Sequence, residues 1–423
     1  MKQVTLFAFA VAMFFSPVMS LCDEAPKPVA QCPFVRLEPA ALGNYPKLWN
    51  KNELFKRPKM TPATDLKFDF EYADNVKPIY LDGIDFKGEP TRFFAWFGMP
   101  KEAAMDKQVP GVVLVHGGGG TAFVQWVEEW TARGYAAIAM DTVGCRPVKR
   151  FEGGGCRVEL SGDRPGMLHD YNWEVANCHD SWTAHAVGTV IRSHSYLRSH
   201  PEVDAASIGI VGISWGGYLT CIAAAVDNRF AAAVPVYGCG FLGEFVGTVS
   251  KANEPWLKLF DPCMFLSSVN CPILFVNRPV DTAYFWEQWV RSSLLPAKAE
   301  RSCRLGFGHS HAAGRVPEAN LFLDAICKGM PRLPKLEKQL VADGVVTAEF
   351  KAEAPVSRAT IAWSDDDDSV TAPKRKWQEA PAEIKGNVIS ASIPPKALRF
   401  YLNLYDQRGG VVSTDGAGWD RQH

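Results

Sequence analysis

The stretch Gly212-Ile213-Ser214-Trp215-Gly216-Gly217 gives the strongest structural signal in this sequence. An apolar run at 207–211 precedes it and predicts a buried strand, and residues 218–226 are small and apolar enough for a helix packed on that strand. Glycines on both sides of a serine permit a sharp turn between strand and helix, because larger side chains would clash there. We therefore expect Ser214 to be a nucleophile, held in a strained turn with its hydroxyl clear of the sheet edge and above a helix N-terminus.

The alternative is a glycine-rich turn that contains a serine by chance, so the chain must also supply the partners of a nucleophilic serine. Such a serine needs a base, a carboxylate that orients the base, and donors for the oxyanion. On a turn of this kind the partners follow in the order Ser, Asp or Glu, His. Asp281 comes just after a predicted strand at 273–277, and we expect it to be the acid even if it also caps the following helix. Asp261 and Glu244 are rival acids, but neither directly follows a clear strand.

The base is expected from Gly306-Phe307-Gly308-His309-Ser310-His311, at the end of the last predicted strand, 302–307. One histidine should bind Asp281 and face Ser214, while the other shapes the loop. We favour His311, because the loop must climb several residues beyond the strand end to reach the serine, and His309 is the alternative. Three other polar residues are expected to be structural: Asp141, His179 and His185.

The oxyanion donors are expected from the glycine run 117–120, which follows a β-branched run at 111–115. Backbone N–H groups must approach a developing alkoxide closely, and side chains would obstruct that approach. We predict Trp215 as one donor and Gly118 or Gly119 as the other. A phosphate-binding loop is the competing interpretation, and it fails because no Gly-Lys-Ser or Gly-Lys-Thr follows the glycines.

Predicted strands and helices alternate along most of the chain, which indicates a mostly parallel sheet with helices on both faces. Antiparallel strands are expected to open this sheet, at 68–72, 79–84 and 91–97. A second composition begins near Pro334, where short alternating strands separated by Pro, Gly and Asp turns predict a small all-β sandwich. The acidic run 365–368 is expected to be a solvated turn in this part, with a calcium site as the alternative.

We divide the chain into four parts: a signal peptide at 1–20, an N-terminal extension at 21–60, a catalytic domain at 61–333 and a β-sandwich-like domain at 334–423. Lys2 followed by an apolar run that ends in small residues is typical of a cleaved secretory signal, so we expect a secreted or periplasmic protein. This run is too short for a comfortable membrane span. Eleven cysteines are compatible with an oxidising compartment, and Cys145 with Cys156 is a candidate disulfide.

A net charge of −1 gives no reason to expect a nucleic-acid partner or an anionic membrane surface. No pair of cysteines has the spacing of a zinc site, and we expect neither a metal nor a cofactor. The expected partner is therefore a small-molecule or polysaccharide substrate.

The residues placed above resemble the α/β-hydrolase superfamily, and within it the secreted acetylxylan-esterase-like and dienelactone-hydrolase-like proteins. The resemblance covers about residues 65 to 330 and lies in these stretches: 116–120, His179-Asp180-Ser181-Trp182, 212–217, Asp281 and His309-Ser310-His311. It implies hydrolysis of short acyl esters without a cofactor, often of acetyl groups on plant polysaccharides. Relatives usually carry Asn-Gly-Thr ahead of the acid, whereas Asn277 is followed here by Arg278-Pro279-Val280. An arginine at this place could reorient the acid or reach into the substrate site.

The leading hypothesis is thus a serine carboxylic ester hydrolase of the acetylxylan type. One alternative is a serine peptidase of the prolyl-oligopeptidase type, which shares the turn but usually carries a large propeller domain that this chain lacks. A carbohydrate-binding protein without turnover is the other alternative, and the presence of all three triad residue types argues against it.

Overall fold

The computed structural model describes residues 48–147, 157–159, 175–244 and 254–416. Among these residues, nine strands form one mixed sheet, in the spatial order β1 (Met60–Pro62), β2 (Val76–Asp82), β3 (Arg92–Gly98), β5 (Ala136–Met140), β4 (Val109–Val115), β8 (Val203–Ile213), β9 (Ala232–Val236), β10 (Ile273–Asn277) and β11 (Ala299–Cys303). The first three strands pair antiparallel, and β5 through β11 pair parallel. The central strands are apolar along their whole length because helices cover both of their faces.

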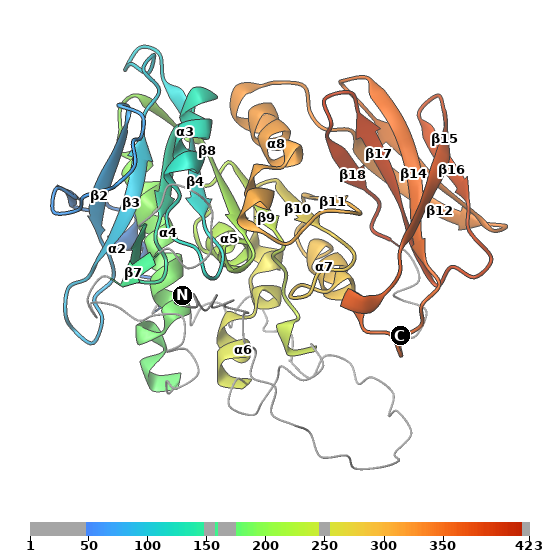
Figure 1. The fold of residues 1–423 in the computed structure, drawn as a ribbon, viewed down its shortest axis with the longest axis horizontal. Helices are drawn as coiled ribbons and strands as arrows, with labels where there is room; N and C mark the ends of the chain where they lie inside the picture. The colour runs from blue at the N-terminus through green and yellow to red at the C-terminus, as the bar shows by residue number, and fades with distance from the viewer. Residues whose placement is uncertain (1–47, 148–156, 160–174, 245–253, 417–423) are drawn as a thin grey trace, which may run out of the picture.

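The helices form two groups on the sheet (Figure 1). α3 (Val124–Ala132) and α8 (Pro317–Lys328) lie together, and the hydroxyl of Tyr135, in the turn between α3 and β5, donates to Asp324 of α8 at 2.9 Å. α4 (Trp182–Arg198) packs against α5 (Trp215–Val226) in the other group. The remaining helical segments are shorter: α2 (Lys51–Leu54), α6 (Glu254–Phe260), α7 (Trp286–Ser293), and the 3₁₀ turns η3 (Val175–Asp180), η4 (Leu242–Glu244), η5 (Pro262–Met264), η6 (Leu266–Ser268), η7 (His311–Arg315) and η8 (Ala372–Lys374).

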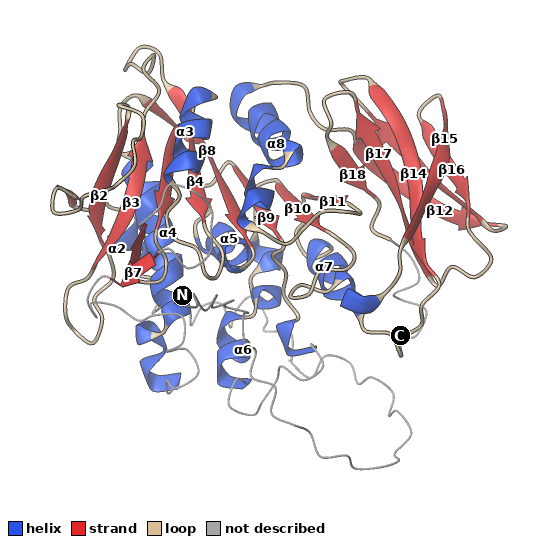
Figure 2. Ribbon diagram, in the orientation of Figure 1, coloured by secondary structure: helices blue, strands red, loops and turns tan. Residues whose placement is uncertain are grey.

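A second, antiparallel sheet follows α8 and stands beside α7 and α8 (Figure 2). Its strands run in the spatial order β12 (Lys335–Ala342), β13 (Val345–Lys351), β16 (Val388–Ser392), β15 (Gln378–Lys385), β14 (Val356–Ser364), β17 (Arg399–Asp406) and β18 (Val411–Ser413). The sheet folds into a sandwich around buried aromatic and aliphatic residues, among them Phe350, Ile361, Phe400 and Leu402. A two-stranded ribbon, β6 (Cys145–Pro147) with β7 (Arg157–Glu159), completes the strands of the described residues.

The expected fold class is confirmed: the first part is an α/β fold with a mostly parallel sheet, and the C-terminal part is an all-β sandwich. Two predicted strands were wrong. Residues 68–72 form no strand, because Phe68 and Tyr72 both turn onto Trp96, with ring centroids 4.7 Å away in each case, instead of alternating between faces. The last parallel strand occupies Ala299–Cys303, earlier than the predicted 302–307, because Gly306 takes a positive φ of 73° and ends the extended run.

Two strands of the sandwich escaped the sequence analysis. β12 is rich in charged residues and mostly exposed, so it lacks the apolar alternation on which strand prediction depends. β15 alternates Ala380, Ala382 and Ile384 with exposed residues, but alanine and proline are poor strand formers, so the signal is weak. The proposed partner of Cys145, Cys156, lies outside the described residues. A weaker candidate disulfide, Cys263 with Cys271, was wrong, because Cys271 is not in a disulfide.

Candidate active site

Five parallel strands end at the same edge of the large sheet, and each is followed by a residue or loop of the candidate site. β4 leads into the glycine run, β8 into Ser214, β9 into Tyr237, β10 into the loop of Asp281, and β11 into the loop of His309. The register places Val115 of β4 opposite Gly212, and Ile213 opposite Val236 of β9. Because parallel strands share one carboxyl edge, these loops converge on one place.

Ser214 stands in the sharp turn that its glycines predict. Its φ of 56° and ψ of −119° lie outside the regions that L-residues prefer, and its N–H donates to the Val236 carbonyl at 2.8 Å. A Cβ on Gly212 would lie 2.1 Å from the Gly216 carbonyl oxygen, and one on Gly216 would lie 2.2 Å from that of Val115. Glycine is therefore required at both positions, and the strained serine is held between β8 and α5.

A chain of two hydrogen bonds joins Ser214 to a buried carboxylate. The Ser214 hydroxyl lies 2.9 Å from Nε2 of His309, and Nδ1 of the same imidazole lies 2.7 Å from Oδ2 of Asp281. With Nδ1–H donating to the carboxylate, Nε2 is free to accept the serine proton. Asp281 is fully buried, while the His309 side chain remains 23% exposed. Solvent therefore reaches the imidazole beside Ser214 but not the carboxylate.

The structure brings together Ser214, Asp281 and His309, and it does not place His311 between them. The sequence-based preference for His311 needs correction at this point. It assumed a strand that ends at residue 307, whereas β11 ends at Cys303. The loop therefore leaves the sheet earlier in the sequence, and the histidine that reaches Ser214 is His309.

His311 lies against the glycine run instead. Its Nε2 would be 3.2 Å from a Cβ on Gly117 and 2.6 Å from one on Gly120, and its ring contacts Phe123 at a centroid distance of 5.0 Å. Burial lowers the pKa of His311 to about 4, and repulsion by the neighbouring His116 and His309 acts in the same direction. His311 therefore shapes the loop as a neutral side chain.

The glycine run also touches the serine directly. A Cβ on Gly117 would come within 3.0 Å of the Ser214 Cβ, so a larger residue there would displace the serine. His116 fixes this loop, because its Nδ1–H donates to the Gly117 carbonyl at 2.8 Å and its Nε2 accepts from the Thr142 N–H at 3.0 Å. The predicted donors Gly118 and Gly119 belong to this loop, with Gly119 at a positive φ of 74°. Trp215, the other predicted donor, is the first residue of α5.

Asp281 is held from two further sides. Its Oδ1 accepts from the N–H groups of Ala283 and Tyr284 at 2.9 and 2.8 Å, so the acid also organises the turn before α7. Arg278 places Nε 3.5 Å from Oδ2 and donates from a terminal nitrogen to the Phe307 carbonyl at 3.1 Å. Arg278 therefore connects the acid loop to the histidine loop.

Tyr237 and Tyr284, which the sequence analysis did not select, flank the imidazole of His309. Tyr237 stacks on it at a centroid distance of 4.5 Å, and Tyr284 lies parallel to it at 6.4 Å on a ring plane tilted by only 7°. Tyr237 directly follows β9 at the active edge, and this position was a usable signal. Burial raises the pKa of both phenols still further above physiological pH, so both hydroxyls stay protonated.

Among the remaining candidate residues, Asp261 and Asp141 make structural contacts. Asp261 accepts from the backbone N–H groups of Phe241, Leu242 and Cys263, and so organises a loop beyond β9. Asp141 accepts from the N–H of Cys145 and lies 3.7 Å from His116. Glu244, His179 and His185 lie in η4, η3 and α4. Within the described ranges, no group of three or more His, Cys, Asp and Glu side chains is arranged to hold a metal ion.

Together, the fold and the geometry at its carboxyl edge are those of an α/β hydrolase. Among solved structures, an acetyl xylan esterase from Paenibacillus sp. R4 is similar at 19% identity and a TM-score of 0.53, with 71% of this chain and 96% of that chain covered. Acetyl xylan esterase 1 from Thermoanaerobacterium sp. JW/SL YS485 is similar at 17% identity and a TM-score of 0.47, with 63% and 88% covered. At these identities the first likeness supports the fold alone.

The match that shows the family comes from the sequence itself. Residues 44–265 match the family model described as acetyl xylan esterase (AXE1), which is more than half of the 423 residues. The chain belongs to the acetyl xylan esterase family and is a carboxylic ester hydrolase. None of the helices in the described ranges combines the length and apolar character needed to cross a bilayer.

Proposed function

We propose that this protein is a secreted carbohydrate esterase that removes acetyl groups from xylan-type polysaccharides, with Ser214 as nucleophile, His309 as base and Asp281 as the orienting acid. The observation that carries the proposal is the hydrogen-bonded chain from the Ser214 hydroxyl through His309 to Asp281, at 2.9 and 2.7 Å. Family membership supports an acetyl ester as the substrate. The N-terminal segment that resembles a secretory signal supports export.

The mechanism follows from these positions. The Ser214 hydroxyl attacks the ester carbonyl while its proton moves to Nε2 of His309, and the carboxylate of Asp281 stabilises the imidazolium that forms. The oxyanion of the tetrahedral intermediate accepts from the backbone N–H of Trp215, at the start of α5, and from Gly118 or Gly119. The imidazolium then gives the proton to the departing sugar oxygen as the C–O bond breaks, which releases the sugar as an alcohol and leaves acetyl-Ser214. Water, deprotonated by the same imidazole, hydrolyses this acyl-enzyme and releases acetate.

Buried aromatic rings next to the nucleophile are consistent with a small acyl group. Trp215 is half-buried and contacts Trp182 and Tyr218 at centroid distances of 5.6 and 5.3 Å. These rings pack on one another at the start of α5, beside the serine.

Acetate release from acetylated xylan, measured for the wild type and for Ser214→Ala, tests the proposal. We expect release by the wild type, loss of release in the variant, and labelling of Ser214 by a fluorophosphonate. Cleavage of peptide amides in preference to esters would instead support the peptidase alternative. Retained polysaccharide binding without turnover of any ester would overturn the enzymatic assignment.

A further inference from the structure

The C-terminal sandwich makes a dense polar contact with the first turn of α7, close to the candidate acid. The Glu287 carboxylate accepts from Arg375 and, at 2.9 Å, from Nε of Arg399. Both guanidinium groups are buried, at 8% and 5% exposure, and both also approach Asp368 of the acidic run. Two buried cations from one domain thus share a single carboxylate of the other. Such a pair is costly to break, because each charge that loses its partner remains desolvated.

Aromatic packing reinforces the same junction. Trp286, which precedes Glu287, is 1% exposed and contacts Trp377 and Tyr401 of the sandwich at centroid distances of 5.2 and 6.2 Å. A Cβ on Gly416 would lie 2.7 Å from this indole, so the end of the sandwich also closes on it. The first two residues of α7 are therefore fixed mainly by the C-terminal domain.

This junction lies a short stretch of backbone from the carboxylate of Asp281. Oδ1 of Asp281 accepts from the N–H groups of Ala283 and Tyr284, and Asn277 donates to the Tyr284 carbonyl at 3.0 Å. The chain then enters α7 at Trp286. Movement of the first turn of α7 would carry these two N–H donors with it and rotate Oδ2 away from His309.

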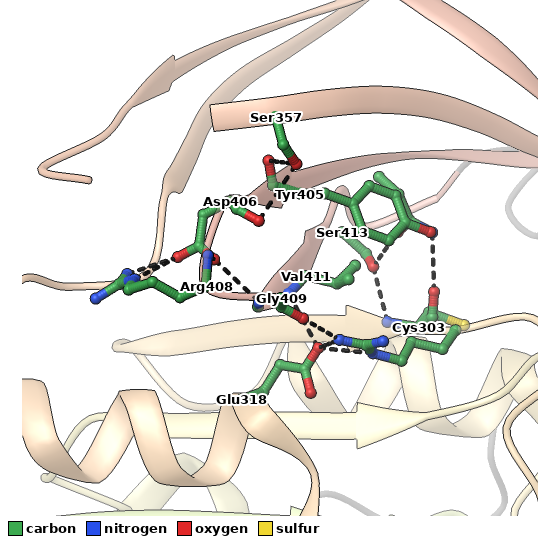
Figure 3. A network of polar contacts seen from close by, with 12 residues as sticks. Cys303, Glu318, Ser357, Tyr405, Asp406, Arg408, Gly409, Val411 and Ser413 are labelled. Carbon is green, nitrogen blue, oxygen red and sulfur yellow. Dashed lines mark hydrogen bonds and ion pairs between the residues drawn. The ribbon is translucent and has the colours of Figure 1, made fainter. Parts of the chain in front are cut away.

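The sandwich also holds the strand from which the histidine loop starts (Figure 3). At the end of β11, the Cys303 N–H donates to the Ser413 hydroxyl at 2.7 Å, and its carbonyl accepts from Asn403 at 3.1 Å. The next residue, Arg304, binds the Glu318 carboxylate and the Gly409 carbonyl. Glu318 in turn accepts from the Val411 N–H at 2.9 Å. The C-terminal domain therefore holds the backbone where the acid loop ends, at α7, and the backbone where the histidine loop begins, at β11.

We infer that the C-terminal β domain is part of the catalytic apparatus, and that Glu287, held by Arg375 and Arg399, is a positioning residue for Asp281. This inference depends on the proposed roles of Ser214, His309 and Asp281. Glu287 touches no reacting atom. It fixes the turn whose N–H groups orient the acid, and through the acid it fixes the imidazole. A displacement of about 1 Å at a catalytic group can cost about 100-fold in rate.

Glu287→Gln in the full-length protein tests the inference, because it keeps the size of the side chain and removes its charge. We expect kcat for p-nitrophenyl acetate to fall about 10- to 100-fold with KM changed less than about 2-fold. The acidic limb of the pH–rate profile should move to lower pH, because a looser carboxylate stabilises the imidazolium less. Glu287→Asp should recover part of the rate. Glu337→Gln is the matched control, since it makes the same substitution within the sandwich, removes only an exposed ion pair with Lys351 and should leave kcat unchanged.

A circular-dichroism melt of each variant establishes that it is folded at the assay temperature. If Glu287→Gln does not fold, Arg399→Gln gives the same test, because Arg375 still binds Glu287. A folded variant that keeps the wild-type kcat and pH profile while its melting temperature falls would overturn the inference, since the contact would then be structural only. The rate of Ser214 labelling by a fluorophosphonate should fall in parallel with kcat. This rate requires no particular ester, so a wrong substrate class leaves the test intact, whereas a wild type that is neither labelled nor active refutes the proposed function itself.

Discussion

The imidazole of His309 lies on the ring of Tyr237 at a centroid distance of 4.5 Å and an interplanar angle of 13°. The Tyr237 hydroxyl donates to the carbonyl of Gly308, the residue before the histidine, at 2.7 Å. Tyr237 itself has a positive φ of 54°, which a non-glycine residue rarely adopts. A strained backbone at the end of β9 therefore presents one side chain that supports both the ring and the backbone of the candidate base.

Removal of the Tyr237 hydroxyl should break its hydrogen bond to Gly308 while the aromatic ring stays stacked on His309. We expect Tyr237→Phe to lower kcat for p-nitrophenyl acetate about 2- to 10-fold, because a neutral hydrogen bond contributes about 0.5–1.5 kcal/mol. Tyr237→Leu, which also removes the stacked ring, should lower kcat further. Steady-state kinetics of both variants check the order. Equal rates for the wild type and Tyr237→Leu would show that the stack does not position the base.

The two histidines of the loop should behave very differently when substituted. We expect His309→Gln to lower kcat/KM at least about 1,000-fold, as loss of a triad base does elsewhere, and His311→Gln to lower it less than about 10-fold. The reason is geometric, since only His309 lies within hydrogen-bond distance of both Ser214 and Asp281. Ester hydrolysis by both purified variants is the measurement. The opposite order would restore the sequence-based choice of His311.

Most residues of the candidate site could be selected from the sequence because strand ends and glycine turns are local features. Ser214 and Asp281 follow β8 and β10, which are apolar enough to be recognised without neighbours. The choice between His309 and His311 depended instead on where β11 ends. That strand reads Ala-Glu-Arg-Ser-Cys and shows little apolar pattern, because the sandwich, and not a helix, covers its outer edge through Ser413 and Asn403.

The contacts of the C-terminal domain could not be predicted for a related reason. Glu287, Arg375 and Arg399 are distant in sequence and belong to types that normally remain in solvent. The two arginines are buried only where the sandwich meets α7, and the sequence shows no pattern that predicts this contact. The acidic run was expected to be a solvated turn, and Asp365, Asp367 and Asp368 are indeed exposed. The ion pair between Asp368 and Arg399 was not predicted.

His311 should make stability depend on pH. Burial holds its pKa near 4 in the folded protein, against about 6.5 when unfolded, so its contribution is fully present above about pH 6.5 and is lost as the pH falls toward 4. Between pH 7 and 4.5 the expected loss is about 2 kcal/mol. Urea unfolding at both pH values should show a smaller decrease for His311→Gln than for the wild type. Parallel decreases would mean that His311 titrates normally in the folded state.

Gly212 and Gly216, the glycines on either side of Ser214, should tolerate no side chain. A Cβ on Gly216 would lie 2.2 Å from the Val115 carbonyl oxygen and 2.7 Å from that of His116, both of which are backbone atoms that cannot rotate away. We expect Gly216→Ala to destabilise the protein by about 1–3 kcal/mol, as overpacking of a filled core does. Thermal melts provide the measurement, with Gly88→Ala as a control where a Cβ meets nothing within 4 Å. Because Gly88 has a φ of 83°, the control carries backbone strain but no clash.

Arg278 should affect catalysis more than stability, because it joins two loops at the active edge. Its guanidinium group lies 3.5 Å from Oδ2 of Asp281 and donates to the Phe307 carbonyl at 3.1 Å. Arg278 therefore fixes the position of the acid relative to the backbone before His309. We expect Arg278→Met to lower kcat about 10-fold, since a hydrogen bond from a charged group contributes about 1.5–3 kcal/mol and only part of that acts on the reacting geometry. The kcat of Arg278→Lys should lie between those of the wild type and Arg278→Met, because a single ammonium group cannot reach both acceptors as the planar guanidinium group does. Kinetics on p-nitrophenyl acetate and on acetylated xylan distinguish the two possible roles of this residue. A loss of kcat on both substrates supports the positioning role, whereas a rise in KM confined to the polysaccharide would mean that Arg278 contacts the sugar.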